Sequence, residues 1–227
     1  MRKILLCIIL TWIPACAGMT GLLLHGYFNP LHAQENSAVT FLNAAELNEN
    51  KTLIANIEAY LTSLTTIASN FNQVAPDGTL TSGKFYMQRP GKMRWQYNPP
   101  TPILMVANGI ELVFYDYELE QVNHIPLNDS IISFLAREKI QFGGDIGILS
   151  VEDKEGVIRI EVAELKKPTE GRILLEFSKT PLLIRNMVIT DATNQVTSVS
   201  LSSAEFGKKL DKELFIWRDP RKPRKRT

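Results

Sequence analysis

Residues 80–97, LTSGKFYMQRPGKMRWQY, contain the pattern that decides the fold. Two runs in which apolar and polar residues alternate, Leu80–Gln88 and Lys92–Tyr97, flank the sequence Arg-Pro-Gly, which is typical of a tight turn. Short loops of this kind join antiparallel neighbours, so this stretch predicts a β-hairpin.

The same pattern continues on both sides of the hairpin. Further short runs, separated by turn residues, predict strands at residues 69–75, 103–107, 111–117, 120–125, 157–165, 172–178, 182–190, 196–205 and 213–217. A sheet of about eleven antiparallel strands must curl or close to protect its edges. We therefore expect a mainly β protein of the α+β class, built on a curled antiparallel sheet or incomplete β-barrel with a concave face.

Two segments interrupt this pattern with helical spacing. Apolar residues recur at three- and four-residue steps from Ala44 to Ala68, and the segment from Asp129 to Lys139 contains the apolar residues Ile131, Ile132, Phe134 and Leu135. Because several strands are apolar on both faces, we expect these helices to form a lid over the concave face and enclose an apolar cavity. Periodicity leaves open whether side chains or a ligand fill the cavity.

The first residues have the features of an export signal. A basic start at residues 1–3 precedes an apolar run, and a small-residue cleavage site ends at Ala33, so we expect a signal peptide over residues 1–33 and export to the periplasm. An uncleaved membrane anchor and lipidation at Cys16 are alternatives. Both cysteines, Cys7 and Cys16, lie in this leader, so the mature chain has no thiol for a disulfide or a metal.

No catalytic motif accompanies this fold. His124 is the only histidine after the leader, and the sequence lacks a Gly-x-Ser-x-Gly elbow and a phosphate-binding glycine loop. We therefore predict a binding protein without enzymatic activity or cofactor. Nucleic acid is not an expected partner, because residues 34–217 are net acidic.

Basic residues gather instead in the C-terminal tail, residues 218–227. The tail is rich in proline and charge, which predicts disorder. It serves either as a solubilising end or as a segment attracted to anionic lipid headgroups.

Arg89 is the most unusual residue of the opening stretch. It shares strand parity with Phe85 and Met87, so a concave position for those side chains directs Arg89 into apolar surroundings. A buried guanidinium needs hydrogen-bond acceptors, either backbone carbonyls of a covering loop or a carboxylate. The alternative is that Arg89, at the end of its strand, reaches solvent.

Three parts of the sequence carry a resemblance to a known family. Residues 83–95 (GKFYMQRPGKMRW), residues 103–109 (ILMVANG) and the pair Phe114-Tyr115 resemble the periplasmic outer-membrane lipoprotein carriers of the LolA family. The similarity runs from about Val39 to Trp217. It implies an incomplete β-barrel closed by helices, whose cavity takes the acyl chains of lipoproteins that an inner-membrane ABC transporter releases.

The resemblance also implies roles for individual residues. Arg89 matches the arginine that bonds to the helical lid, Met93 matches an apolar position that receives the ligand, and Trp95 belongs to the same wall. The chain departs from the family pattern at Met93, where an aromatic residue is common, and in its basic tail. The methionine is flexible and apolar and should still serve.

We therefore expect residues 34–217 to form a monomeric periplasmic carrier domain. Its partners would be acylated lipoproteins, the releasing ABC transporter and an outer-membrane acceptor. The expected cavity and lid residues are Phe85, Met87, Arg89, Met93, Trp95, Leu112, Phe114, Ile131, Phe134 and Leu135. The alternatives are a membrane-anchored acceptor of the LolB type, which needs a lipidated Cys16, and a structural envelope protein with a filled core.

Overall fold

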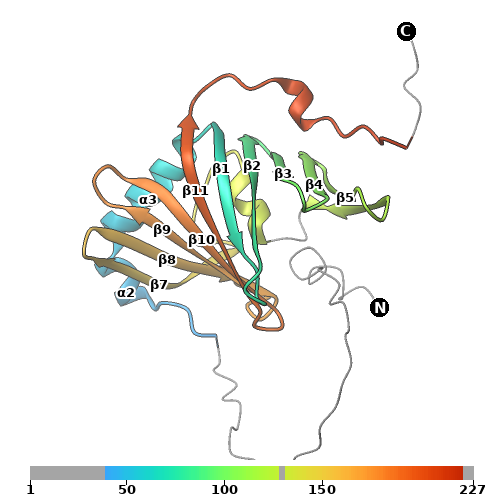
Figure 1. Ribbon diagram of the computed structural model, residues 1–227. Helices are drawn as coiled ribbons and strands as arrows, with labels where there is room; N and C mark the ends of the chain where they lie inside the picture. Colours follow the sequence, from blue (N-terminus) through green and yellow to red (C-terminus); the bar gives the residue numbers. More distant parts are fainter. Residues whose placement is uncertain (1–38, 128–130, 222–227) are drawn as a thin grey trace, which may run out of the picture.

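The computed structural model describes residues 39–127 and 131–221, except for the side chains of Ile131 and Ile132 (Figure 1). The predicted signal peptide and most of the basic tail lie outside these residues. The strands of the structure are β1 (Thr66–Val74), β2 (Leu80–Gln88), β3 (Lys92–Tyr97), β4 (Ile103–Asn108), β5 (Glu111–Asp116), β6 (Gln121–Pro126), β7 (Ile146–Lys154), β8 (Val157–Glu164), β9 (Gly171–Ser178), β10 (Leu183–Asp191) and β11 (Val196–Phe206).

All these strands belong to one open sheet. The 11 strands follow the order β6-β5-β4-β3-β2-β1-β11-β10-β9-β8-β7, and all neighbours are antiparallel. The first and last strands thus pair in the middle of the sheet, while β6 and β7 form its edges. Figure 1 shows the sheet curving around the helices. The expected antiparallel, curled and unclosed sheet is confirmed.

The helices differ from the expected single segment. Helix α2 (Ala44–Glu49) starts at a capping box formed by Asn43 and Glu46, and α3 (Lys51–Ser63) follows it. The predicted helix was too long at its C-terminal end, because Leu64 has ψ 78° and β1 starts at Thr66. Within the segment predicted at 129–139, the structure has a short 3-10 helix, η2 (Ile131–Ala136).

Two strand predictions were wrong. Strand β7 was missed, because a bulge between Ile148 and Ser150 shifts its alternation and its end is charged. The segment predicted as a strand at residues 213–217 instead contains the 3-10 helix η3 (Lys212–Phe215), which lies over β3 and β4 and pairs with no strand.

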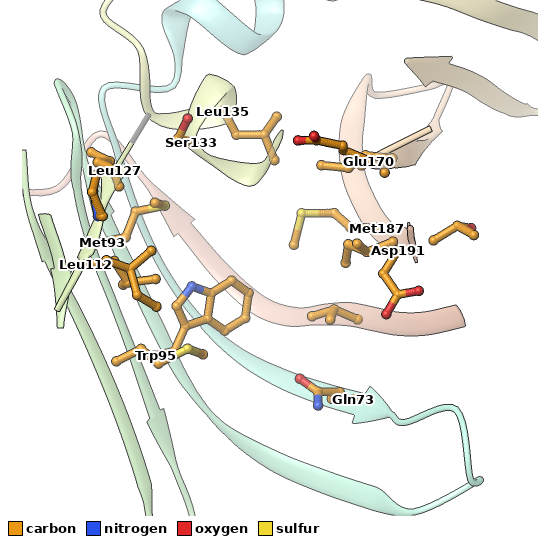
Figure 2. A pocket seen from close by; sticks show the side chains of 18 of the residues that line it. Gln73, Met93, Trp95, Leu112, Leu127, Ser133, Leu135, Glu170, Met187 and Asp191 are labelled. Atoms are coloured by element: carbon orange, nitrogen blue, oxygen red, sulfur yellow. The ribbon is translucent and has the colours of Figure 1, made fainter. Parts of the chain in front are cut away.

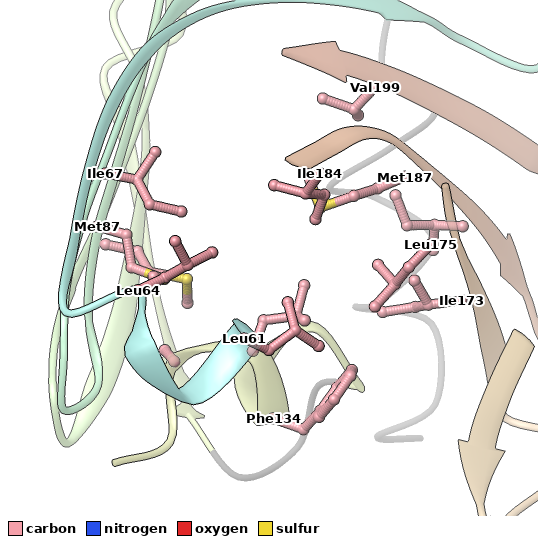
Figure 3. Close-up of a cluster of buried hydrophobic side chains, with 14 of the residues drawn as sticks. Leu61, Leu64, Ile67, Met87, Phe134, Ile173, Leu175, Ile184, Met187 and Val199 are labelled. Atoms are coloured by element: carbon pink, nitrogen blue, oxygen red, sulfur yellow. The ribbon is translucent and has the colours of Figure 1, made fainter. Parts of the chain in front are cut away.

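The sheet is apolar on both faces in its β3–β5 part. On the convex side, Phe215 of η3 is buried. The side chains that β4 and β5 direct to this side are buried as well: Leu104, Val106, Val113 and Tyr115. On the concave side, Leu61 of α3 and Phe134 of η2 extend toward the main core (Figure 3). No helix of the described chain is both long and apolar enough to cross a bilayer.

Candidate functional site

The concave side contains an apolar cavity of about 90 Å³ (Figure 2). Its walls come from both halves of the sheet and from η2, since Trp95 lies on β3, Met187 on β10 and Leu135 on η2. The other lining residues are Gln73, Met93, Tyr97, Met105, Leu112, Ile125, Pro126, Leu127, Ser133, Glu170, Gly171, Ile173, Ile189, Thr190, Asp191 and Val199.

A second cavity, of about 30 Å³, lies beside α3. Leu61 and Leu64, at the C-terminal end of α3, line it together with Arg89. The two cavities share four lining side chains, which are Met93, Trp95, Leu135 and Met187. Two of the four are methionines, which change rotamer easily, so a small rearrangement would join the two cavities into one interior.

The structure brings most of the predicted site residues to these cavities. Phe85, Met87 and Arg89 line the smaller cavity, Leu112 lines the larger one, and the remaining lining residues of the prediction, Met93, Trp95 and Leu135, line both.

Two predicted residues stand apart from the cavities, and a third cannot be placed. Phe114 and Phe134 are buried in the core and line neither cavity, and the ring of Phe134 lies 6.2 Å from that of Phe142. The side chain of Ile131 lies outside the described part of the chain.

An aromatic group forms the β1–β3 part of the concave wall. The ring of Trp95 lies 4.2 Å from that of Phe85 and 5.0 Å from that of Phe71. These residues come from three adjacent strands and face the same side because side chains alternate along each strand. Rings packed edge to face or tilted in this way stabilise the wall beyond their burial alone.

Arg89 connects the sheet to both lid elements. Its Nε donates to the carbonyl oxygen of Leu64 at 2.8 Å, and its Nη1 donates to the carbonyl oxygen of Arg137, just after η2. Its backbone N–H donates to Thr65, and the N–H of Gly91 donates to Ala136 at 2.7 Å. The end of β2 therefore holds the C-terminal ends of α3 and η2 together.

The guanidinium of Arg89 is half-buried without an acidic partner in the described chain. Burial lowers the pKa of Arg89 to about 10. Backbone carbonyls therefore supply its acceptors, and any movement of the lid away from β2 would remove them.

Further hydrogen bonds tie the lid elements to each other. The Thr62 hydroxyl accepts from the N–H of Ile140 at 3.1 Å, and a Glu58 carboxylate oxygen accepts from the N–H of Phe142 at 2.6 Å. Both acceptors belong to α3, and both donors follow η2. These bonds link α3 directly to the segment that follows η2.

The sequence did not predict the polar residues of the larger cavity. The Tyr97 hydroxyl donates to Gln73 Oε1 at 2.8 Å, and both side chains are buried. Burial raises the pKa of Tyr97 well above its usual value. Strand parity could have located Gln73, which lies two residues after the concave Phe71. In residues 39–127 and 131–221, no group of three or more His, Cys, Asp or Glu side chains is placed to hold a metal ion.

Known proteins share this sequence pattern. The family model described as outer membrane lipoprotein carrier protein LolA matches residues 62–217. An outer-membrane lipoprotein carrier protein of Methylococcus capsulatus is 30% identical over 180 residues, covering 72% of this chain and 82% of the relative. An uncharacterized protein of Rickettsia prowazekii is 27% identical, covering 75% of this chain and 79% of the relative.

A solved structure of a LolA superfamily protein from Nitrosomonas europaea is also similar, with a TM-score of 0.42 and 12% identity. The match covers 72% of this chain and 94% of that chain. The family match spans more than half of the 227 residues and includes all strands of the sheet, Arg89 and η2, but only the last two residues of α3. The chain is a member of the outer membrane lipoprotein carrier protein (LolA) family.

Proposed function

We propose that the mature chain is a non-enzymatic periplasmic carrier of acylated lipoproteins. It takes their acyl chains into the space between the concave sheet and the lid, after an ABC transporter of the inner membrane has released them. It then delivers them to the outer membrane, to an acceptor protein where one is present. Cleavage after Ala33 would free this protein from its signal peptide.

The observation that carries the proposal is the apolar cavity beneath a lid that one arginine fastens. Each methylene removed from water contributes about 0.8 kcal/mol, so an acylated protein needs such a shelter to leave a membrane. A protein cavity of about 150 Å³ takes a molecule the size of benzene, so the larger cavity, of about 90 Å³, is too small for a long acyl chain. Ligand entry therefore requires the lid to move outward.

Lid movement would have an energetic consequence at Arg89. Displacement of Leu64 and Arg137 takes the carbonyl acceptors away from the half-buried guanidinium. The open, loaded form is thus strained relative to the closed, empty form. This difference in free energy between the two forms favours release of the lipoprotein to an acceptor that binds it more tightly.

The proposal can be tested by incubating the mature protein, which starts at Gln34, with inner-membrane vesicles that contain a triacylated lipoprotein and its transporter. We expect native mass spectrometry to detect a soluble one-to-one complex. Leu135→Asp, which places a carboxylate in the cavity, should abolish the complex, whereas the exposed Leu119→Asp should retain it. A wild-type protein that stays empty would contradict the carrier function and favour a structural envelope role.

A further inference from the structure

A buried polar pair lies in the wall of the otherwise apolar cavity. Gln73 on β1 is 7% exposed and Tyr97 on β3 is 9% exposed, and both line the larger cavity. Figure 2 shows Gln73 on the side of the cavity opposite Ser133 and Leu135 of η2. A buried polar group costs free energy unless it is hydrogen-bonded, so the donors and acceptors of this pair need partners in an otherwise apolar wall.

The local sequence brings the pair together across β2. Tyr97 lies opposite Gly83, whose lack of a side chain leaves β2 open at this point. A Cβ atom at Gly83 would lie 2.7 Å from the ring of Phe71, against which the Tyr97 ring packs at 5.0 Å. The Tyr97 hydroxyl can therefore reach across β2 to Gln73 on β1. Its hydrogen bond fixes the orientation of the Gln73 amide.

The Gln73 amide keeps its own donors available. Its oxygen accepts from Tyr97, and its NH₂ group has no acceptor within the described part of the chain. Thr81, opposite Gln73 on β2, and Thr197, two residues from its partner Val199 on β11, both have buried hydroxyls without a described partner. Unpaired buried polar groups are rare in native proteins, so a bound polar group is one physical explanation for finding several of them beside Gln73.

The charges around the cavity limit what this group can be. No lysine or arginine lines the larger cavity, whereas the acidic residues Glu170 and Asp191 do. A free carboxylate would meet no cation there, so a neutral oxygen acceptor fits better. The carbonyl of an acyl ester is neutral, accepts hydrogen bonds and stays attached to its hydrocarbon chain.

We propose that Gln73, positioned by Tyr97, donates a hydrogen bond to the ester carbonyl of an acylated ligand. This inference rests on the proposed carrier function and adds that the cavity recognises the linkage of the acyl chain as well as its length. Gln73 is the binding residue, Tyr97 is its positioning residue, and the hydroxyls of Thr81 and Thr197 lie on either side of Gln73.

Two lipid probes of equal chain length test the inference: a dihexadecanoyl glycerol, which has ester carbonyls, and a dihexadecyl glycerol, whose ether linkages have a methylene group in place of each carbonyl. We expect the exported wild-type protein to bind the diester about 5-fold more tightly, as for one neutral hydrogen bond of about 1 kcal/mol. Gln73→Met should remove this preference by weakening the diester only, and Tyr97→Phe should reduce it.

Met187→Leu is the matched control, because Met187 lines the same cavity without a strong hydrogen-bonding group. It should change the affinities for both probes alike. Unfolding temperatures identify a variant that does not fold. The double variant Gln73→Met with Tyr97→Phe removes both partners of the hydrogen bond, so it leaves no unpaired hydroxyl and provides a second test of the diester preference. Equal wild-type affinities, or a preference that survives Gln73→Met, would overturn the inference and leave the carrier function in place. Binding of neither probe by the wild type would overturn both.

Discussion

Two arginines near the β2–β3 hairpin hold short elements against opposite faces of the sheet. The concave cover is the lid, formed by α3 and η2, and the convex cover is η3 with the residues up to Trp217. On the concave face, Arg89 donates to carbonyls of the α3 and η2 ends; on the convex face, Arg94 donates to the carbonyl of Leu214 in η3 at 3.2 Å. Burial lowers the pKa of both guanidinium groups, to about 10 for Arg89. The fastenings are alike in chemistry, and the covers differ in what lies beneath them.

The convex cover fits against side chains that fill the space below it. Phe215 is 3% exposed, and the ring of Trp217 lies 5.0 Å from that of Tyr115. The concave cover encloses cavities that Met93, Trp95, Leu135 and Met187 share. Close packing of side chains holds the convex cover in place. The concave cover lies over cavities and has fewer such contacts, so it depends more on its hydrogen bonds, which a ligand can break.

Phe215→Ala should therefore have the largest effect on stability. Truncation of a buried phenylalanine typically costs about 3–5 kcal/mol, and the filled convex side offers no ligand to compensate. We expect the midpoint of urea unfolding to fall accordingly, while the protein that remains folded still takes up acyl probes. Ile216→Ala, at a side chain that is 45% exposed, is the control and should change the free energy of unfolding by less than about 0.5 kcal/mol. If Phe215→Ala lowered the free energy of unfolding by less than about 1 kcal/mol, packing would not be what holds the convex cover, and the two covers would not differ in this respect.

Arg89→Leu should have the next largest effect, on transfer rather than on stability. The leucine removes the two side-chain hydrogen bonds that Arg89 makes to the lid in the closed form, so opening the lid no longer leaves a half-buried guanidinium without acceptors. We expect loading to persist and transfer of a fluorescent acylated probe to acceptor vesicles to slow about tenfold or more.

Arg94→Leu provides the control on the other face. It removes the hydrogen bond to Leu214 and should leave both loading and transfer rates unchanged. If Arg89→Leu left loading and release as in the wild type, the role of Arg89 in release would be wrong. Equal effects of the two variants would show that transfer does not distinguish the covers.

The sequence predicted the sheet well because most of its strands follow simple alternation between turns. The β2–β3 hairpin is the clearest case, with bounds that match the prediction from Leu80 to Gln88 and from Lys92 to Tyr97. Strand β7 escaped because its bulge at Ile148 breaks the alternation. The C-terminal residues 213–217 form a short apolar run that also suits a strand, but they contain η3, and its Phe215 is buried against the convex face.

The candidate site was predictable only in part, for a related reason. Phe85, Met87, Met93 and Trp95 share one parity along a hairpin, so the sequence places them on one wall. The opposite wall, with Met187 and Val199, comes from strands far along the chain, and only the curvature of the sheet brings it close. Gln73 was missed because a single polar residue at an inward position does not indicate a function. Its role becomes apparent only when the structure shows that Tyr97 is its partner.

The smallest expected effect concerns an exposed ion pair beside the lid. Arg137, just after η2, makes two hydrogen bonds to Asp145 before β7, at 2.7 and 2.9 Å. Both side chains are more than one-third exposed, so the pair should contribute only about 0.2–1 kcal/mol to lid closure. Asp145→Asn should accordingly raise the opening rate of the lid, followed by hydrogen exchange at the N–H of Ile140, by a few-fold at neutral pH.

This pair also predicts a pH dependence with a definite sign. Hydrogen bonds from Arg137 lower the pKa of the Asp145 carboxyl below its ordinary value of 3.8. A lowered pKa in the closed form means that the contribution is fully present above about pH 4 and is lost as the pH falls through the lowered pKa. The wild type should therefore approach the opening rate of Asp145→Asn below pH 4. Rates that differ equally at pH 7 and pH 3 would show that the contribution of Asp145 does not depend on the charge of its carboxyl, and Arg89, whose charge does not change over this range, would then be the charged group that holds the lid.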